Sequence, residues 1–206
     1  MAATRFDDRS YLSPANIGWG FWFRWVFFSL LGFLLSLLFV EIGTRPYLGL
    51  LPGAIGGAVV GLAQWFALRR YFFGVKWWPI ASTVAWALLG ASNLGAVGWI
   101  APRSELLLVR AIAGIIDGAQ IGLFLGLAQW LVLRSLPKAY WWILLNSFAW
   151  AIGLSFGWTV GGILYAIAHL FLCEVFGLAL AWAVVAGIMG VALVRLWRGA
   201  LRSGSK

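Results

Sequence analysis

The sequence predicts an all-α fold: a polytopic membrane protein whose six transmembrane helices form three parallel two-helix repeats. Three observations lead to this prediction. Of the 206 residues, 63% are hydrophobic and only 10% are charged, which is too little charge to cover a soluble domain. Long apolar runs recur along the chain. A nine-residue stretch, GLAQWFALR at 61–69, returns as GLAQWLVLR at 126–134.

Each predicted helix is an apolar segment long enough to cross the roughly 30 Å hydrocarbon core of a bilayer. The fourth and fifth segments exceed the length of a perpendicular crossing, which predicts either tilt or an overhang at the membrane interface. We expect one transmembrane domain over residues 19–198, with short tails at 1–18 and 199–206. The six segments cover residues 19–40, 47–68, 77–100, 106–133, 141–168 and 174–196.

The second and fourth segments carry glycines four residues apart, ahead of and into the repeated stretch. Residues four apart share a helix face, and small residues let helices approach closely in lipid. A glutamine continues each stripe, and we expect it to form a hydrogen bond between helices; a ligand contact is the alternative. The residues are Gly53, Gly57, Gly61 and Gln64 in one copy, and Gly118, Gly122, Gly126 and Gln129 in the other.

Tryptophan and arginine at the helix ends predict anchors at the membrane interface. In each copy a tryptophan precedes an arginine by four residues, and a tryptophan pair opens the next segment. These anchors are Trp65, Arg69, Trp77 and Trp78, then Trp130, Arg134, Trp141 and Trp142. Deeper tryptophans either pack in the core or line a slot for a flat apolar ligand; they are Trp86, Trp150, Trp158 and Trp182.

The repeated unit contains two segments, so its copies have the same orientation. We expect repeats at about residues 19–70, 77–135 and 141–198, and three units suggest a pseudo-threefold bundle. The last segment holds a decayed copy, in which Gly190 stands at the glutamine position. We therefore expect this segment to be the least constrained.

Basic residues orient the chain, because Lys and Arg favour cytoplasmic loops. All of them except Arg45, Arg103 and Arg110 fall on the side of the two termini, which predicts cytoplasmic termini in a plasma or thylakoid membrane. The net charge of +9 comes from basic residues at the helix ends, where we expect them to contact anionic headgroups of the lipid bilayer. Nucleic acid is therefore not an expected partner.

One carboxylate, Asp117, lies near the middle of the fourth segment. An ionisable group inside a membrane is costly unless it is paired, protonated or hydrated. Arg110, Asn93 and Asn146 are candidates for a polar junction with it, and His169 is a polar cap or a weak candidate for an axial pigment ligand. Both a structural role and a proton or substrate role remain open for Asp117.

Enzymatic signatures are missing from the sequence. Cys173 and His169 are the only residues of their types, which excludes a multi-cysteine metal site and a histidine pair for zinc. No catalytic triad or phosphate loop occurs. We expect no enzyme, no metal and no cofactor apart from a pigment or lipid.

The tandem pattern G-x-x-Q-W-x-x-L-R, followed by Trp-Trp and W-A-x-x-G, resembles a group of multi-span membrane proteins of cyanobacteria and some Chloroflexi that have no assigned activity. The resemblance covers the centre of the chain and implies a photosynthetic host, and with it a thylakoid location.

Three functions follow as expectations. The first is a non-catalytic scaffold, assembly factor or accessory subunit of a larger, for example photosynthetic, membrane complex, favoured by short loops and packing stripes. The second is a small transporter or solute-binding membrane subunit, since Asp117, Asn93, Asn146 and the deeper tryptophans are placed to line a cavity. The third is a carrier of a carotenoid, chlorophyll or quinone.

Overall fold

The computed structural model describes residues 18–43, 48–92, 94, 97–102 and 104–203. Within these residues the chain forms six α-helices and two short 3-10 helices. The α-helices are α1 (Trp19–Ser36), α2 (Leu50–Leu68), α3 (Trp78–Ala91), α4 (Leu107–Leu133), α5 (Trp141–Ala168) and α6 (Leu172–Ser203). The 3-10 helices are η3 (Phe73–Trp77) and η4 (Val97–Trp99).

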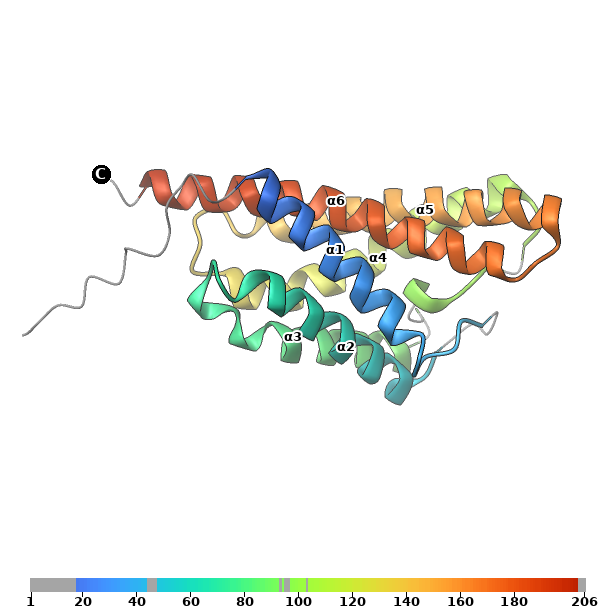
Figure 1. The fold of residues 1–206 in the computed structure, drawn as a ribbon, viewed down its shortest axis with the longest axis horizontal. Helices are drawn as coiled ribbons and strands as arrows, with labels where there is room; N and C mark the ends of the chain where they lie inside the picture. Colours follow the sequence, from blue (N-terminus) through green and yellow to red (C-terminus); the bar gives the residue numbers. More distant parts are fainter. Residues whose placement is uncertain (1–17, 44–47, 93, 95–96, 103, 204–206) are drawn as a thin grey trace, which may run out of the picture.

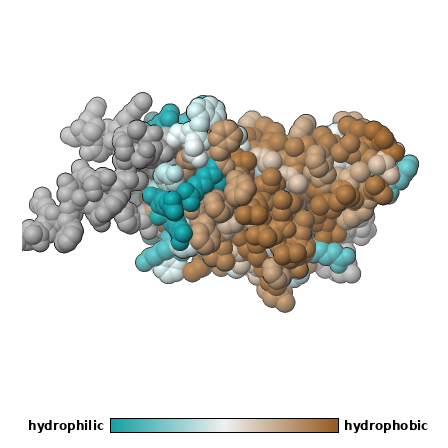
Figure 2. Space-filling view, in the orientation of Figure 1, coloured by the Kyte–Doolittle hydropathy of each residue, from teal (hydrophilic) through white to brown (hydrophobic). Residues whose placement is uncertain are grey.

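Five of these helices, α1, α2, α4, α5 and α6, are long and apolar enough to cross a membrane. Apolar side chains dominate the face seen in Figure 2, and hydrophilic ones gather toward the end where α6 finishes. The chain is therefore an all-helical integral membrane protein.

The third predicted segment differs from expectation, and a continuous helix over residues 77–100 is wrong. Helix α3 has 14 residues, about 21 Å at 1.5 Å per residue, which is shorter than the bilayer core. The backbone turns extended at Ser92, whose hydroxyl donates to the Leu89 carbonyl at 2.9 Å. Such a serine competes with the helical hydrogen bonds and favours a helix end.

After α3, the segment around η4 is held inside the bundle. The Trp182 indole N–H donates to the Gly98 carbonyl at 3.0 Å, and the Trp158 indole N–H donates to the Ile100 carbonyl at 3.1 Å. Non-helical backbone at membrane depth is tolerated only where protein or water satisfies its polar groups. Here two tryptophans satisfy them.

The helices form a ring in chain order, because each packs against the next and α6 returns to α1 (Figure 1). The chain reverses direction at each turn, so that α1 begins and α6 ends at the same end of the bundle (Figure 1). We call this end, with its cationic side chains, the basic end, and the opposite one the far end. The described cations of the basic end are Arg24, Arg69, Arg70, Lys76, Arg134, Lys138, Arg195 and Arg198.

The glycines of α2 lie against α3. A Cβ added at Gly57 would lie 2.6 Å from the Cβ of Trp86, and one at Gly61 would lie 2.9 Å from the Cβ of Ser82. Neither distance is one that real Cβ atoms show. The backbones of α2 and α3 therefore touch along this line.

The glycines of α4 lie against α5 in the same way. A Cβ at Gly126 would lie 2.9 Å from the Cα of Ile143, and one at Gly118 would meet the Trp150 backbone. Gly114, which the sequence stripe did not include, extends the line to Ser155. Both stripes thus face the following helix, so the close pairs α2–α3 and α4–α5 cross the boundaries of the predicted repeats.

These contacts predict the effect of adding one methyl group at a stripe position. Gly57→Ala should lower the free energy of unfolding by about 1–3 kcal/mol, because overpacking forces the helices apart. Gly20→Ala in α1 is the control, since nothing lies within 4 Å of a Cβ there. Thermal unfolding in mild detergent measures both; equal loss in the two variants would contradict the stripe as a packing surface.

Candidate functional site

The centre of the ring is filled by tryptophan. The ring centroid of Trp86 lies 4.6 Å from that of Trp99 and 5.5 Å from that of Trp150. The ring centroids of Trp150 and Trp182 are 4.9 Å apart. All four side chains are buried, and these three pairs meet edge to face, a favoured arrangement for aromatic rings. The sequence predicts a deep position for three of them but not for Trp99, which lies at the end of the continuous helix predicted over residues 77–100.

Three helices share a pattern of three residue types, spaced four residues apart, on the face toward this centre. Tryptophan comes first, a small polar residue second and an aromatic residue third, all on one face. The sets are Trp25, Ser29 and Phe33 on α1, Trp78, Ser82 and Trp86 on α3, and Trp142, Asn146 and Trp150 on α5. The spacing on α1 was visible in the sequence but went unrecognised. The first tryptophans of the three sets are neighbours: the ring centroids of Trp25 and Trp78 are 5.9 Å apart, and those of Trp78 and Trp142 are 5.8 Å apart.

The two glutamines of the repeated stretch accept hydrogen bonds from these tryptophans. The Trp78 indole N–H donates to Gln64 Oε1 at 2.9 Å, and the Trp142 indole N–H donates to Gln129 Oε1 at 3.1 Å. Gln129 Oε1 also accepts from Asn146 Nδ2 at 3.0 Å. All five residues are buried. The glutamines therefore join α2 to α3 and α4 to α5 side chain to side chain.

The position equivalent to these glutamines on α6 is Gly190, and it has no free space. A Cβ there would lie 2.8 Å from Cδ1 of Trp22 and 3.0 Å from Cδ1 of Trp25. The expectation that the last segment is the least constrained stays a prediction, although Gly190 itself is closely packed. Within the described chain, the buried Trp25 indole nitrogen has no hydrogen-bond partner, whereas Trp22 donates to the Gly187 carbonyl at 2.8 Å.

A small cavity of about 30 Å³ remains among these side chains. Gln64, Gln129, Asn146 and Ser29 supply its polar lining, and four tryptophans supply much of the rest. The Oδ1 atom of Asn146 is buried and lacks a partner among the described residues. A polar space of this size holds about one water molecule, which leaves no room for an organic solute.

A buried ion pair lies toward the far end. Arg110 Nη2 contacts Glu174 Oε1 at 2.7 Å, and Nη1 donates to Oε2 at 2.9 Å. Arg110 also donates to the carbonyls of Ser104 at 2.6 Å and Trp158 at 3.3 Å. The predicted junction of Arg110 with Asp117 is therefore corrected: Glu174 on α6 is the partner. The sequence placed both charges near the far end but gave no signal that they meet.

The other members of the predicted polar junction do not come together. Asp117 is partly exposed, and no hydrogen bond or ion pair joins it to another described residue. Asn146 bonds to Gln129 at the centre, and His169 is exposed at the end of α5, with its ring 6.2 Å from that of Tyr165. Asn93 lies outside the described residues.

The predicted interface anchors divide into two groups. Trp77 and Trp141 are about half exposed, whereas Trp78 and Trp142, their neighbours in the chain, are fully buried and bond inward. The Arg69 guanidinium lies 5.1 Å from the Trp65 ring, a cation–π contact. In the second copy, Trp130 is partly buried and Arg134 is exposed.

No protein-family model, curated protein or solved structure matches the chain. Among the described residues, no three His, Cys, Asp or Glu side chains gather to hold a metal ion. Function must therefore be inferred from this geometry.

The glutamine contacts predict unequal effects of two equivalent substitutions. Gln129→Leu should lower the free energy of unfolding by about 1–3 kcal/mol, because it leaves two buried donors without their acceptor. Gln64→Leu should cost less, since Gln64 Oε1 accepts from Trp78 and its amide makes only a long bond of 3.4 Å to Ser29. Unfolding in detergent, followed by tryptophan fluorescence, gives the comparison.

The matched control for this experiment is Gln120→Leu, on the same helix as Gln129 but partly exposed. It should leave the stability of the isolated protein near that of the wild type. A loss as large as that of Gln129→Leu would mean that the central hydrogen bonds are not the cause.

Proposed function

We propose that the protein is a non-catalytic integral membrane scaffold or accessory subunit that binds a transmembrane helix of another protein through the outer face of α4. Asp117 is the observation that carries this proposal. It lies ten residues after the start of α4, about 15 Å along the helix, and is partly exposed. A carboxylate at such a depth costs about 3 kcal/mol in lipid, so it needs a partner.

The surroundings of Asp117 support a helix as that partner. Gln120 and Phe124 follow at intervals of three and four residues and share its face. Phe124 is 47% exposed, and Ile116, which precedes Asp117 in the chain, is 51% exposed. A neighbouring helix that brings a lysine, arginine or amide to this depth would pair with the carboxylate and cover the apolar side chains.

The closed core favours this function over the two alternatives. Ligand pockets measure roughly 300–1,000 Å³, against about 30 Å³ at the centre of the ring. Neither a transported solute nor a pigment has space there. Of the residues predicted to line a cavity, Asn146 and three of the deep tryptophans lie at this closed centre, whereas Asp117 is partly exposed on α4. A peripheral contact is therefore the better supported reading.

The finer topology belongs to the same proposal. We infer that α3 and the segment around η4 together make a sixth crossing, because the chain passes from the basic end to the far end over their length (Figure 1). By the positive-inside tendency, the basic end faces the cytoplasm in a plasma or thylakoid membrane. Duplication of a two-helix unit accounts for the repeated stretch.

Reporter fusions test this orientation in a bacterial plasma membrane. A periplasm-dependent phosphatase fused after Lys206 should be inactive, and the same enzyme fused after Phe171, between α5 and α6, should be active. The reverse pattern would place the basic end outside.

Site-specific photocrosslinking in the native membrane tests the partner. A photoreactive residue at Phe124 should give one discrete protein adduct, and one at Phe148, 59% exposed on α5, should not. Asp117→Leu should abolish the adduct and Asp117→Asn should retain much of it, because an amide keeps the hydrogen bonding.

The crosslinked protein must itself carry a basic or amide residue at the depth of Asp117, and substitution of that residue should also abolish the adduct. An adduct that is indifferent to Asp117→Leu, or the same adduct from Phe148, would overturn the proposal.

A further inference from the structure

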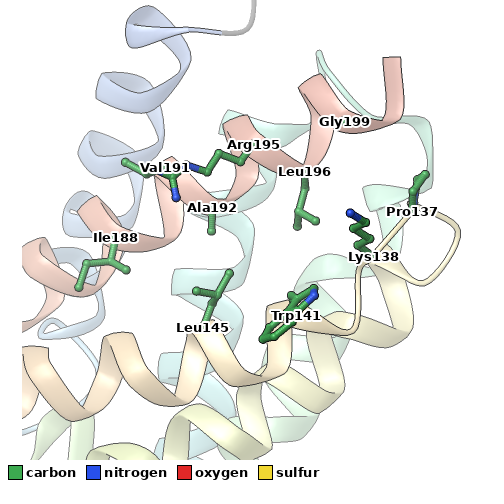
Figure 3. A pocket seen from close by; sticks show the side chains of 10 residues that line it. All are labelled: Pro137, Lys138, Trp141, Leu145, Ile188, Val191, Ala192, Arg195, Leu196 and Gly199. Atoms are coloured by element: carbon green, nitrogen blue, oxygen red, sulfur yellow. The ribbon is translucent and has the colours of Figure 1, made fainter. Parts of the chain in front are cut away.

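A groove of about 850 Å³ runs between α5 and α6 at the basic end. Figure 3 shows Trp141 and Leu145 of α5 facing Ala192 and Leu196 of α6 across it, with Lys138 entering from the loop before α5. The groove lies on the periphery of the ring, apart from the central cavity and from the face of α4 around Asp117.

The groove exists because α5 and α6 pack closely only toward the far end. There Gly157 adjoins Gly177, and a Cβ at Gly157 would lie 2.6 Å from the Cβ of Ala181. Toward the basic end the facing positions carry Leu145 and Ile188 instead. Larger side chains keep two helices further apart, which opens the space between them.

The lining of the groove has two chemical parts. Lys138 and Arg195 are its charged residues, and both are cationic; most of the others are apolar. No described acidic residue lies at the basic end: Glu41, Glu105 and Glu174 lie toward the far end, and Asp117 lies within α4. Among the described residues these two cations have no acidic partner, so the groove suits an anionic ligand.

The loop backbone places Lys138 over the groove at an energetic cost. Lys138 has φ = 60°, the left-handed region, which costs a residue with a Cβ about 1–2 kcal/mol. Strain of this kind tends to accumulate at ligand-binding positions. The Lys138 carbonyl accepts the Trp141 N–H at 3.1 Å, so the loop is tied directly to the wall of the groove.

We propose that this groove binds one anionic phospholipid of the leaflet at the basic end. Lys138 contacts the headgroup phosphate, and Arg195, whose side chain reaches toward Val191 and away from Lys138 in Figure 3, adds positive charge along the groove. The part of an acyl chain nearest the headgroup lies along Leu145, Ile188 and Ala192. Trp141, 48% exposed, stands at the mouth, where an indole suits the level of the headgroups. The volume of about 850 Å³ falls within the range of small-molecule ligand sites.

Lipid binding to the purified full chain in detergent, measured by native mass spectrometry, tests the proposal. The probes are phosphatidylglycerol and phosphatidylcholine with identical acyl chains. One phosphatidylglycerol should bind per chain in clear preference to phosphatidylcholine. Lys138→Gln and Arg195→Gln should each weaken phosphatidylglycerol binding about fivefold, the usual contribution of one basic residue at an anionic surface.

Two further variants separate the groove from general attraction to positive charge. Lys76→Gln removes the same charge from another loop of the basic end, where Lys76 Nζ lies 5.7 Å from the Trp77 ring, and it should not change binding. Val191→Trp keeps every charge but fills the apolar wall, and it should abolish binding while circular dichroism and melting temperature stay near those of the wild type.

Equal retention of both lipids, an equal loss in Lys76→Gln, or full binding by a folded Val191→Trp would each overturn the proposal. Inorganic phosphate at millimolar concentration should not displace the lipid. Displacement would instead identify a site for a soluble anion.

Discussion

A tryptophan buried in a membrane protein brings an N–H group that no bilayer water can satisfy, and acceptors for several of these groups link neighbouring elements of the helix ring. Gln64 and Gln129 serve α3 and α5, and Ser36 of α1 accepts the Trp99 indole at 2.7 Å. In each case donor and acceptor belong to different elements, so one bond fixes both the rotation and the depth of a helix against its neighbour. The glycines permit close approach, but only the hydrogen bonds select one register.

In the irregular segment after α3 the requirement is reversed, because here backbone carbonyls need hydrogen-bond donors. Its backbone has left the helix and holds carbonyls that need donors, while α5 and α6 hold tryptophans that need acceptors. Gly98 and Ile100 supply the carbonyls, so two groups that would each be costly alone satisfy one another. This exchange explains why a 14-residue helix is stable in a bundle of longer ones, and why the chain does not continue α3 to the far end.

Hydropathy predicted five of the helices well, because their apolar runs coincide with their hydrogen-bonded lengths. It failed over residues 77–100, since an apolar run marks burial in lipid or protein but not where a helix ends. The stripe spacing placed Gln64 and Gln129 on a packing face, yet it gave no partner, because indole donors lie on the following helix. The pair of Arg110 and Glu174 spans 64 residues, and no periodic pattern connects such distant charges. Packing alone brings them together.

The contact between α6 and α1 lacks a glutamine acceptor like those of α2 and α4. Gly190 stands where the sequence pattern would place the glutamine, and Trp22 packs against it and donates its indole N–H to a backbone carbonyl of α6. Trp25 keeps the packing of its counterparts but has no acceptor among the described residues. The seam between α6 and α1 therefore closes by aromatic packing and a backbone contact, without the side-chain bond that joins α2 to α3 and α4 to α5. Unpaired polarity therefore remains both in the core, at Trp25 and at Asn146 Oδ1 beside the small cavity, and on the outer face of α4, at Asp117, where another helix can reach it.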